Sequence, residues 1–166
     1  MKMILQFLPF GLAILIYCGN ISRFPNFMIR PYNYSFKDKY ISDIVGKNKT
    51  IIIFMPLEGC GICINETLNA LKKLYSTSQI IILTYAKDSF RKIQIKIVSK
   101  EIKENIYFYD IINPDTKNQN KFIQLFSEIS YFVTDSNLNI LNNNNLPYDE
   151  NQIIDELTKL DDFIKK

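Results

Sequence analysis

Two continuous apolar runs mark the centre of the expected fold. Residues 50–55 (TIIIFM) and 79–86 (QIIILTYA) have the length of strands and are rich in isoleucine, which is typical of strands covered on both faces. The stretch between them, 60–75, has apolar residues at helical spacing. Those residues are Ile64, Leu68, Leu71 and Tyr75. The three stretches together predict a β-α-β unit with a right-handed crossover.

The next part of the chain predicts two further helices around a short strand. Residues 88–103 fit a helix through Phe90, Ile93 and Ile97, but KIQIKIV within them alternates like a strand. The preceding β-α-β order favours the helix. NIYFYDI then has the length of a short strand, NPDT predicts a turn, and 116–128 predicts a helix.

The last part predicts a hairpin followed by a closing helix. Residues 129–141 contain two β-prone runs separated by Asp-Ser-Asn, whose residue types favour a tight turn. The four asparagines at 142–145 are expected to form a polar loop. A helix beginning near Asp149 aligns apolar residues on one face. Those residues are Ile153, Leu157, Leu160 and Ile164.

The first 20 residues have the layout of a targeting or anchoring segment. Lys2 precedes an apolar run from Met3 to Tyr17. This run has roughly 15 residues where a spanning helix needs about 20, which favours a signal peptide over a membrane anchor. Cys18 follows LIY, a sequence that resembles the lipobox of bacterial lipoproteins and makes acylation of Cys18 a third interpretation. All three place the folded part outside the cytoplasm. The expected location is extracytoplasmic and membrane-associated, on the periplasmic side of a bacterial membrane.

Residues 21–35 contain two prolines and no helical period, so they are interpreted as a linker that leads into an irregular entry strand. This leaves 36–166 as one folded domain, a length that a single hydrophobic core accommodates. Hydrophobic residues make up 47% of the chain, which is enough to build a packed interior.

Composition excludes several functions. The net charge of +3 is scattered along the chain, so we expect no binding of nucleic acid. The chain has no histidine, which removes Ser-His-Asp and Cys-His relays and imidazole metal ligands. Reactivity therefore has to come from thiols, carboxylates, lysines or tyrosines.

Cys60 and Cys63 are the strongest candidates for that reactivity. They follow a buried strand at the start of the predicted helix, where unpaired backbone amides favour a thiolate. Cys60 is nearer the exposed tip and is the expected nucleophile, and Cys63 is placed to resolve a mixed disulfide. A zinc site needs about four ligands and two thiols are present here, so no metal is expected. Exchange between thiols uses the two sulfurs alone, so no organic cofactor is expected either. Inert packing of the two cysteines is the remaining alternative.

The stretch FMPLEGCGICINETLNALKKL resembles the active-site region of thioredoxin-fold proteins, and most closely the membrane-tethered thiol-disulfide oxidoreductases of the TlpA/ResA-like branch. Cys60 and Cys63 match the redox pair of that branch, and Glu66 matches its glutamate three residues later. The resemblance implies a three-layer α/β fold with a central mixed sheet flanked by helices. It also implies dithiol-disulfide exchange with protein thiols or disulfides, with the protein acting as a reductant. Glu66, about one turn beyond Cys63 on the predicted helix, is a candidate for relaying the Cys63 proton, and a first-turn glutamate that favours the helix dipole is the alternative.

The chain departs from this family at four positions. Gly59 and Ile62 replace the tryptophan and proline that usually precede the two cysteines, and Phe54 replaces the buried carboxylate of thioredoxin. The position of the family's cis-proline falls on Ile129. These departures leave a second hypothesis open, a non-catalytic thioredoxin-like binding protein with a vestigial cysteine pair. A peroxide-reducing relative is the third, although no arginine and threonine are evident near the cysteines in the sequence.

Overall fold

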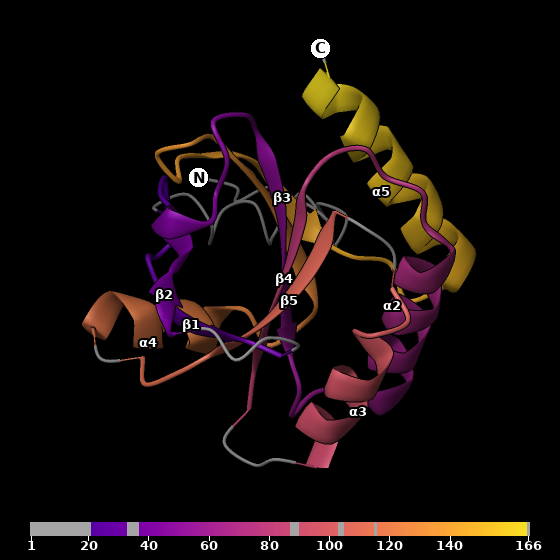
Figure 1. The fold of residues 1–166 in the computed structure, drawn as a ribbon, viewed down its shortest axis with the longest axis horizontal. Helices are drawn as coiled ribbons and strands as arrows, with labels where there is room; N and C mark the ends of the chain where they lie inside the picture. The colour runs from indigo at the N-terminus through magenta and orange to yellow at the C-terminus, as the bar shows by residue number, and fades with distance from the viewer. Residues whose placement is uncertain (1–20, 33–36, 87–89, 103–104, 115, 166) are drawn as a thin grey trace, which may run out of the picture.

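A mixed β-sheet forms the centre of the molecule. The computed structural model describes residues 21–32, 37–86, 90–102, 105–114 and 116–165, and the sheet that they form has seven strands in the order β2-β1-β5-β4-β3-β6-β7 (Figure 1). The strands are β1 (Met28–Pro31), β2 (Lys39–Tyr40), β3 (Thr50–Pro56), β4 (Ile80–Tyr85), β5 (Ile106–Ile111), β6 (Ser130–Thr134) and β7 (Ile140–Asn145). The pairs β3–β4 and β4–β5 are parallel, and the others are antiparallel. The predicted order of a parallel β-α-β unit and a late antiparallel hairpin is confirmed.

Helices cover both faces of the sheet (Figure 1). They are α2 (Gly61–Lys73), α3 (Phe90–Val98), α4 (Lys117–Leu125) and α5 (Glu150–Lys165), together with the short 3-10 helix η1 (Ile41–Asp43). Helices α2, α3 and α5 lie on one face, and α4 lies on the other. The expected three-layer α/β fold is confirmed, including the helix at 90–98 where the sequence pattern was ambiguous.

The face away from α2 is packed by phenylalanines, and two of them come from the segment interpreted as a linker. Phe24 and Phe27 are buried to 1% and 0% exposure. The ring of Phe24 lies 4.9 Å from that of Phe122 and 5.0 Å from that of Phe132, both in edge-to-face geometry. The linker interpretation of 21–35 is therefore wrong for residues 21–32, because the side chains of Phe24 and Phe27 fill the space between the sheet and α4, while the expected entry strand is present as β1.

Three further expectations differ from the structure. The asparagines at 142–145 belong to β7, whose backbone pairs with β6 as the edge of the sheet, so the predicted polar loop is wrong. Tyr75 lies beyond the end of α2 and is 78% exposed, so it does not belong to the apolar face of the helix as the spacing predicts. On α3 the buried residues are Ile95 and Val98, while Phe90, Ile93 and Ile97 point outward.

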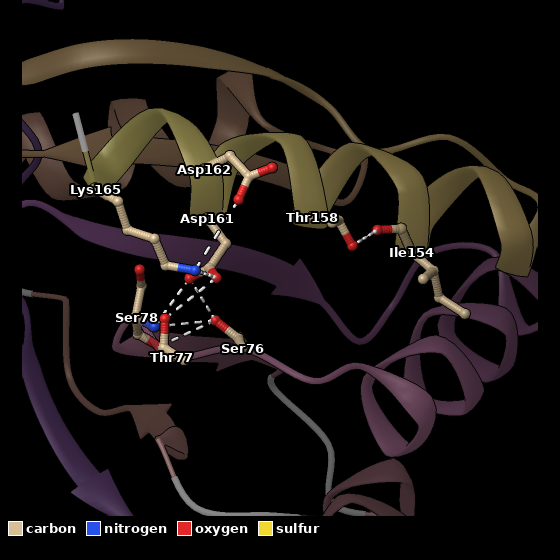
Figure 2. A network of polar contacts seen from close by, with 8 residues as sticks. All are labelled: Ser76, Thr77, Ser78, Ile154, Thr158, Asp161, Asp162 and Lys165. Atoms are coloured by element: carbon tan, nitrogen blue, oxygen red, sulfur yellow. Dashed lines mark hydrogen bonds and ion pairs between the residues drawn. The ribbon is translucent and has the colours of Figure 1, made fainter.

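A buried carboxylate fixes the end of α5 against the loop that leads into β4 (Figure 2). Asp161 accepts hydrogen bonds from the Ser76 hydroxyl and the Ser78 amide, each at 2.9 Å. Lys165, one turn later on the same helix, forms an ion pair with Asp161 at 2.6 Å. Burial alone would raise the pKa of Asp161, but the lysine and the serine donors outweigh burial and hold the pKa well below its usual range.

The amino-terminal segment at 1–20, with Cys18, lies outside the described residues, so its interpretation as a signal peptide, membrane anchor or acylated segment stays a prediction. Within the described part of the chain, no helix combines the length and the hydropathy that crossing a bilayer requires.

Candidate active site

Cys60 occupies the N-cap of α2, immediately beyond the carboxyl end of β3. A short loop, Leu57–Gly59, connects the two elements, and Cys60 has extended backbone geometry with φ −61° and ψ 113°. The Cys60 sulfur accepts a hydrogen bond from the backbone amide of Cys63 at 3.3 Å. The sulfur thus takes up one of the amides that a helix start leaves unpaired, which is the geometry that favours a thiolate.

Cys63 lies one turn further along the helix and forms a disulfide with Cys60, with the two Cα atoms 5.3 Å apart. Cys60 is exposed, whereas Cys63 is half-buried and packs against the core under α2. The order expected from the sequence, an exposed first sulfur and a more protected second one, is the order that the structure shows.

An apolar pocket of about 360 Å³ opens beside the two cysteines. Besides the two cysteines, its lining includes Pro56, Ile64, Ile129 and Tyr148. Ile129 is thus beside the cysteines, where the resemblance placed the family's cis-proline. Every peptide bond among the described residues is trans, so the loop before β6 keeps this position with an ordinary backbone.

Glu66 and Phe54 also lie where the sequence suggested. Glu66 is on α2 one turn beyond Cys63 and is half-buried. Phe54 is fully buried on the opposite face of the sheet, where it packs edge-to-face on Phe122 with a centroid distance of 5.5 Å. A phenylalanine supplies no proton, so any relay to Cys63 has to come from another group.

Arg91 was missed by the sequence analysis. It lies in the first turn of α3, and its Nη1 donates to the backbone carbonyls of Leu57 and Gly59, the latter at 2.8 Å. The guanidinium therefore holds the loop that leads into Cys60. No local signal marks Arg91, because it belongs to a basic, apolar stretch whose pattern only predicts a helix.

Other charged groups surround the site. Glu58 is an exposed residue of the same loop, and Glu128 lines the pocket beside Tyr148. The negative charge of Glu128 raises the pKa of the Tyr148 hydroxyl. In the described ranges, no three carboxylate and thiol side chains come together as a cluster that could hold a metal ion.

Comparisons with known proteins identify the fold. No protein-family profile and no curated protein sequence matches the chain. Solved structures do match: copper-bound yeast Sco1 is 19% identical, with a TM-score of 0.56, over 86% of this chain and 94% of that one. A thiol:disulfide interchange protein from a Bacteroides species is 16% identical, with a TM-score of 0.55, over 87% and 90%. A peroxiredoxin-like protein from Aquifex aeolicus is 12% identical, with a TM-score of 0.53, over 84% and 85%.

The chain has the thioredoxin fold. The mixed sheet, the helices on both faces and the cysteine pair at the start of α2 agree with this assignment. Because all three identities are below 20%, the likeness establishes the fold, and function has to be argued from the site.

Proposed function

We propose that the protein exchanges thiols and disulfides with cysteines of other proteins, acting as an extracytoplasmic reductant. One observation carries the proposal: an exposed cysteine caps a helix through its sulfur, and a second sulfur is within bonding distance one turn away. This arrangement supplies both a nucleophile and a group that resolves the mixed disulfide. The reducing direction rests on the resemblance to the TlpA/ResA-like branch.

The reaction starts from the reduced pair. The Cys60 thiolate attacks one sulfur of a partner disulfide, which forms a Cys60–partner disulfide and releases the other partner sulfur as a thiolate. Cys63 then loses its proton and attacks the Cys60 sulfur, which closes the Cys60–Cys63 disulfide and releases the second partner thiolate. Two electrons pass to the partner, whose thiolates take up two protons. Glu66, one turn from Cys63, is the proposed acceptor of the Cys63 proton.

The surroundings of the cysteines favour a protein partner over a small thiol. Ile62, between the two cysteines, is 73% exposed, and Phe90, next to Arg91, is 85% exposed. On the other side, the pocket bounded by Ile129 and Tyr148 is mostly apolar. Large apolar side chains exposed around a reactive group are characteristic of surfaces that bind polypeptide.

Membrane association is also part of the proposal. The positions of the first described residues and of Cys60 determine how an anchored domain would be oriented. The Ser22 carbonyl accepts from the Ile140 amide at the end of the sheet where β3 begins, whereas Cys60 follows the other end of β3. A seven-residue strand spans about 20 Å. An anchor at 1–20 would therefore hold the domain directly at the membrane with the cysteines on the side away from it.

Two alternatives make different predictions. A binding protein with a vestigial pair would keep the fold but not exchange disulfides. Copper binding is raised by the yeast Sco1 likeness, and thiolates do suit Cu(I). The described residues offer no third thiol or carboxylate donor in a cluster with the pair, so exchange fits this site better.

The test is disulfide reduction by the full chain. The reduced protein is mixed with a protein disulfide substrate, and the loss of substrate disulfide is followed together with oxidation of the chain. We expect stoichiometric transfer by the native protein and none by Cys60→Ser. A native protein that leaves the substrate oxidised under reducing and oxidising buffers alike would support the binding-protein alternative.

A further inference from the structure

We propose that Arg91 is a positioning residue for the cysteine pair, which fixes the loop before Cys60 and places a positive charge that favours the Cys60 thiolate. This inference rests on the proposed exchange function, because it assigns a determinant of the reactivity of the same site. Arg91 comes from α3, an element that is separate in sequence from both β3 and α2.

Arg91 is hydrogen-bonded to the loop before Cys60. One guanidinium nitrogen donates to the carbonyls of both Leu57 and Gly59, so a single group restrains both ends of the loop. Within the loop itself, the Gly59 amide donates to the Pro56 carbonyl at 3.4 Å, a long contact. The Leu57 amide also donates to the Tyr85 carbonyl at 2.9 Å, so the sheet holds the start of the loop, and Arg91 holds the end of the loop at Gly59, next to Cys60.

The Arg91 guanidinium occupies the space beside Gly61 where a side chain would otherwise lie. A Cβ atom at this position would lie 3.4 Å from Nη2 of Arg91 and 4.0 Å from its Cζ. The guanidinium thus passes directly against the backbone of the residue that follows Cys60. A side chain larger than alanine at position 61 would occupy the volume that Arg91 uses, so the glycine and the arginine are structurally linked.

Arg91 is on a helix, α3, that contacts both the sheet and α2. The neighbouring Lys92 forms an ion pair with Asp110 on β5 at 2.7 Å, and the two side chains are only 25% and 16% exposed. Gln94 donates to Asn65 on α2 at 2.9 Å. These contacts fix α3 to the sheet and to α2, which keeps the guanidinium in place instead of leaving it to move with solvent.

The positive charge of Arg91 opposes the effect that nearby carboxylates have on the Cys60 thiolate. Glu58 lies on the loop, Glu128 and Tyr148 line the pocket beside the cysteines, and Glu66 lies further along α2, beyond Cys63. A carboxylate near Cys60 disfavours its thiolate. Arg91 is a cation hydrogen-bonded to the loop, and it supports the thiolate together with the helix start. Because it stabilises the reduced, ionised form, it also makes the Cys60–Cys63 disulfide easier to reduce.

The experiment measures ionisation of Cys60 alone, in full-length protein carrying Cys18→Ser and Cys63→Ser. The rate of alkylation by iodoacetamide is recorded against pH with the native arginine, with Arg91→Gln, and with Arg91→Lys. We expect Arg91→Gln to raise the pKa of the Cys60 thiol by about one unit. Arg91→Lys keeps the charge but does not bridge two carbonyls with a planar fork, so a smaller rise is expected.

Lys96→Gln is the matched control, since it removes an exposed cation from the same helix away from the loop. It should leave the alkylation profile unchanged. An unchanged profile for Arg91→Gln, even with a lower melting temperature, would overturn the proposal and leave Arg91 a structural residue. An equal shift from Lys96→Gln, or full recovery with Arg91→Lys, would overturn the specific role of the bridging geometry. Alkylation needs no protein partner, so these outcomes are independent of whether disulfide exchange occurs.

Discussion

The backbone amide of Cys63 donates a hydrogen bond to the Cys60 sulfur at 3.3 Å, so the first cysteine caps the helix that carries the second. This relationship assigns different roles to the two thiols. In Cys63→Ser the mixed disulfide with a partner should accumulate, because the resolving thiol is missing. In Cys60→Ser no such adduct should form. Non-reducing electrophoresis after mixing with a protein disulfide distinguishes the two, and adducts formed equally by both variants would contradict the assignment.

Glu66 provides a test of proton transfer. Its position one turn beyond Cys63 puts a negative charge near the second thiol, and a nearby anion disfavours thiolate. Glu66→Gln should therefore lower the pKa of Cys63 and slow resolution of the mixed disulfide. The thiol titration is followed by pH-dependent alkylation in Cys18→Ser, Cys60→Ser protein. An identical Cys63 titration with and without Glu66 would show that the carboxylate has no part in the relay.

Ile62 tests whether the apolar surface binds protein partners. Ile62→Ser removes an exposed apolar side chain between the cysteines and should raise KM for a protein disulfide by about three- to tenfold. Reduction of a small disulfide such as oxidised glutathione should be little affected. Tyr75→Ser is the control, because Tyr75 is 78% exposed just beyond the opposite end of α2. Equal losses with both substrates would point to altered cysteine chemistry instead of partner binding.

Asp161 provides a test of stability and its pH dependence. Asp161→Asn should lower the free energy of unfolding by about 1–3 kcal/mol, because charge-assisted hydrogen bonds and an ion pair are weakened. The pKa of Asp161 is lower in the folded than in the unfolded chain. Its contribution is therefore complete above about pH 4 and decreases as the pH falls toward the folded-state pKa.

Denaturant unfolding at several pH values measures this contribution. The native protein and Asp161→Asn should differ most near neutral pH and converge in acid. Asp162→Asn is the matched control, since Asp162 is 69% exposed and lies 4.0 Å from the same lysine. Its effect should stay within about 0.5 kcal/mol. A difference for Asp161→Asn that grows in acid would contradict the sign of the shift.

Phe24 tests whether the domain begins before the expected boundary. Phe24→Ala should cost about 3–5 kcal/mol of unfolding free energy, because the ring is buried among Phe122 and Phe132. Phe90→Ala is the control, since that ring is 85% exposed. Thermal unfolding of the two variants gives the comparison, and a native melting temperature for Phe24→Ala would restore the linker interpretation.

Short-range patterns were sufficient to predict the centre of the fold. The runs of isoleucine in β3 and β4 predict that both strands are buried, and the CGIC motif after β3 predicts where α2 begins. These features depend on neighbours in sequence. The position of Ile129 beside the cysteines came instead from the resemblance to the thioredoxin-fold family, and the antiparallel pairing of β6 with β3 explains why the loop before β6 lies there.

Features that depend on distant contacts were not predictable. Phe24 is in a proline-containing segment without periodicity, and only its partners on α4 and β6 show that it is core. The asparagines of β7 have low strand propensity, and their pairing with β6 outweighs it. Arg91 contacts a loop 32 residues earlier in the chain, a relationship that no local pattern encodes.

The central claim is that Cys60 and Cys63 form a reversible redox pair. The most direct measurement equilibrates the full chain with glutathione buffers of graded potential and counts alkylatable thiols at each. The account predicts that two thiols, Cys60 and Cys63, disappear together in one two-electron transition, and that Cys60→Ser abolishes it. Thiols that remain alkylatable across the whole range, or that are lost one at a time as separate glutathione adducts, would contradict it.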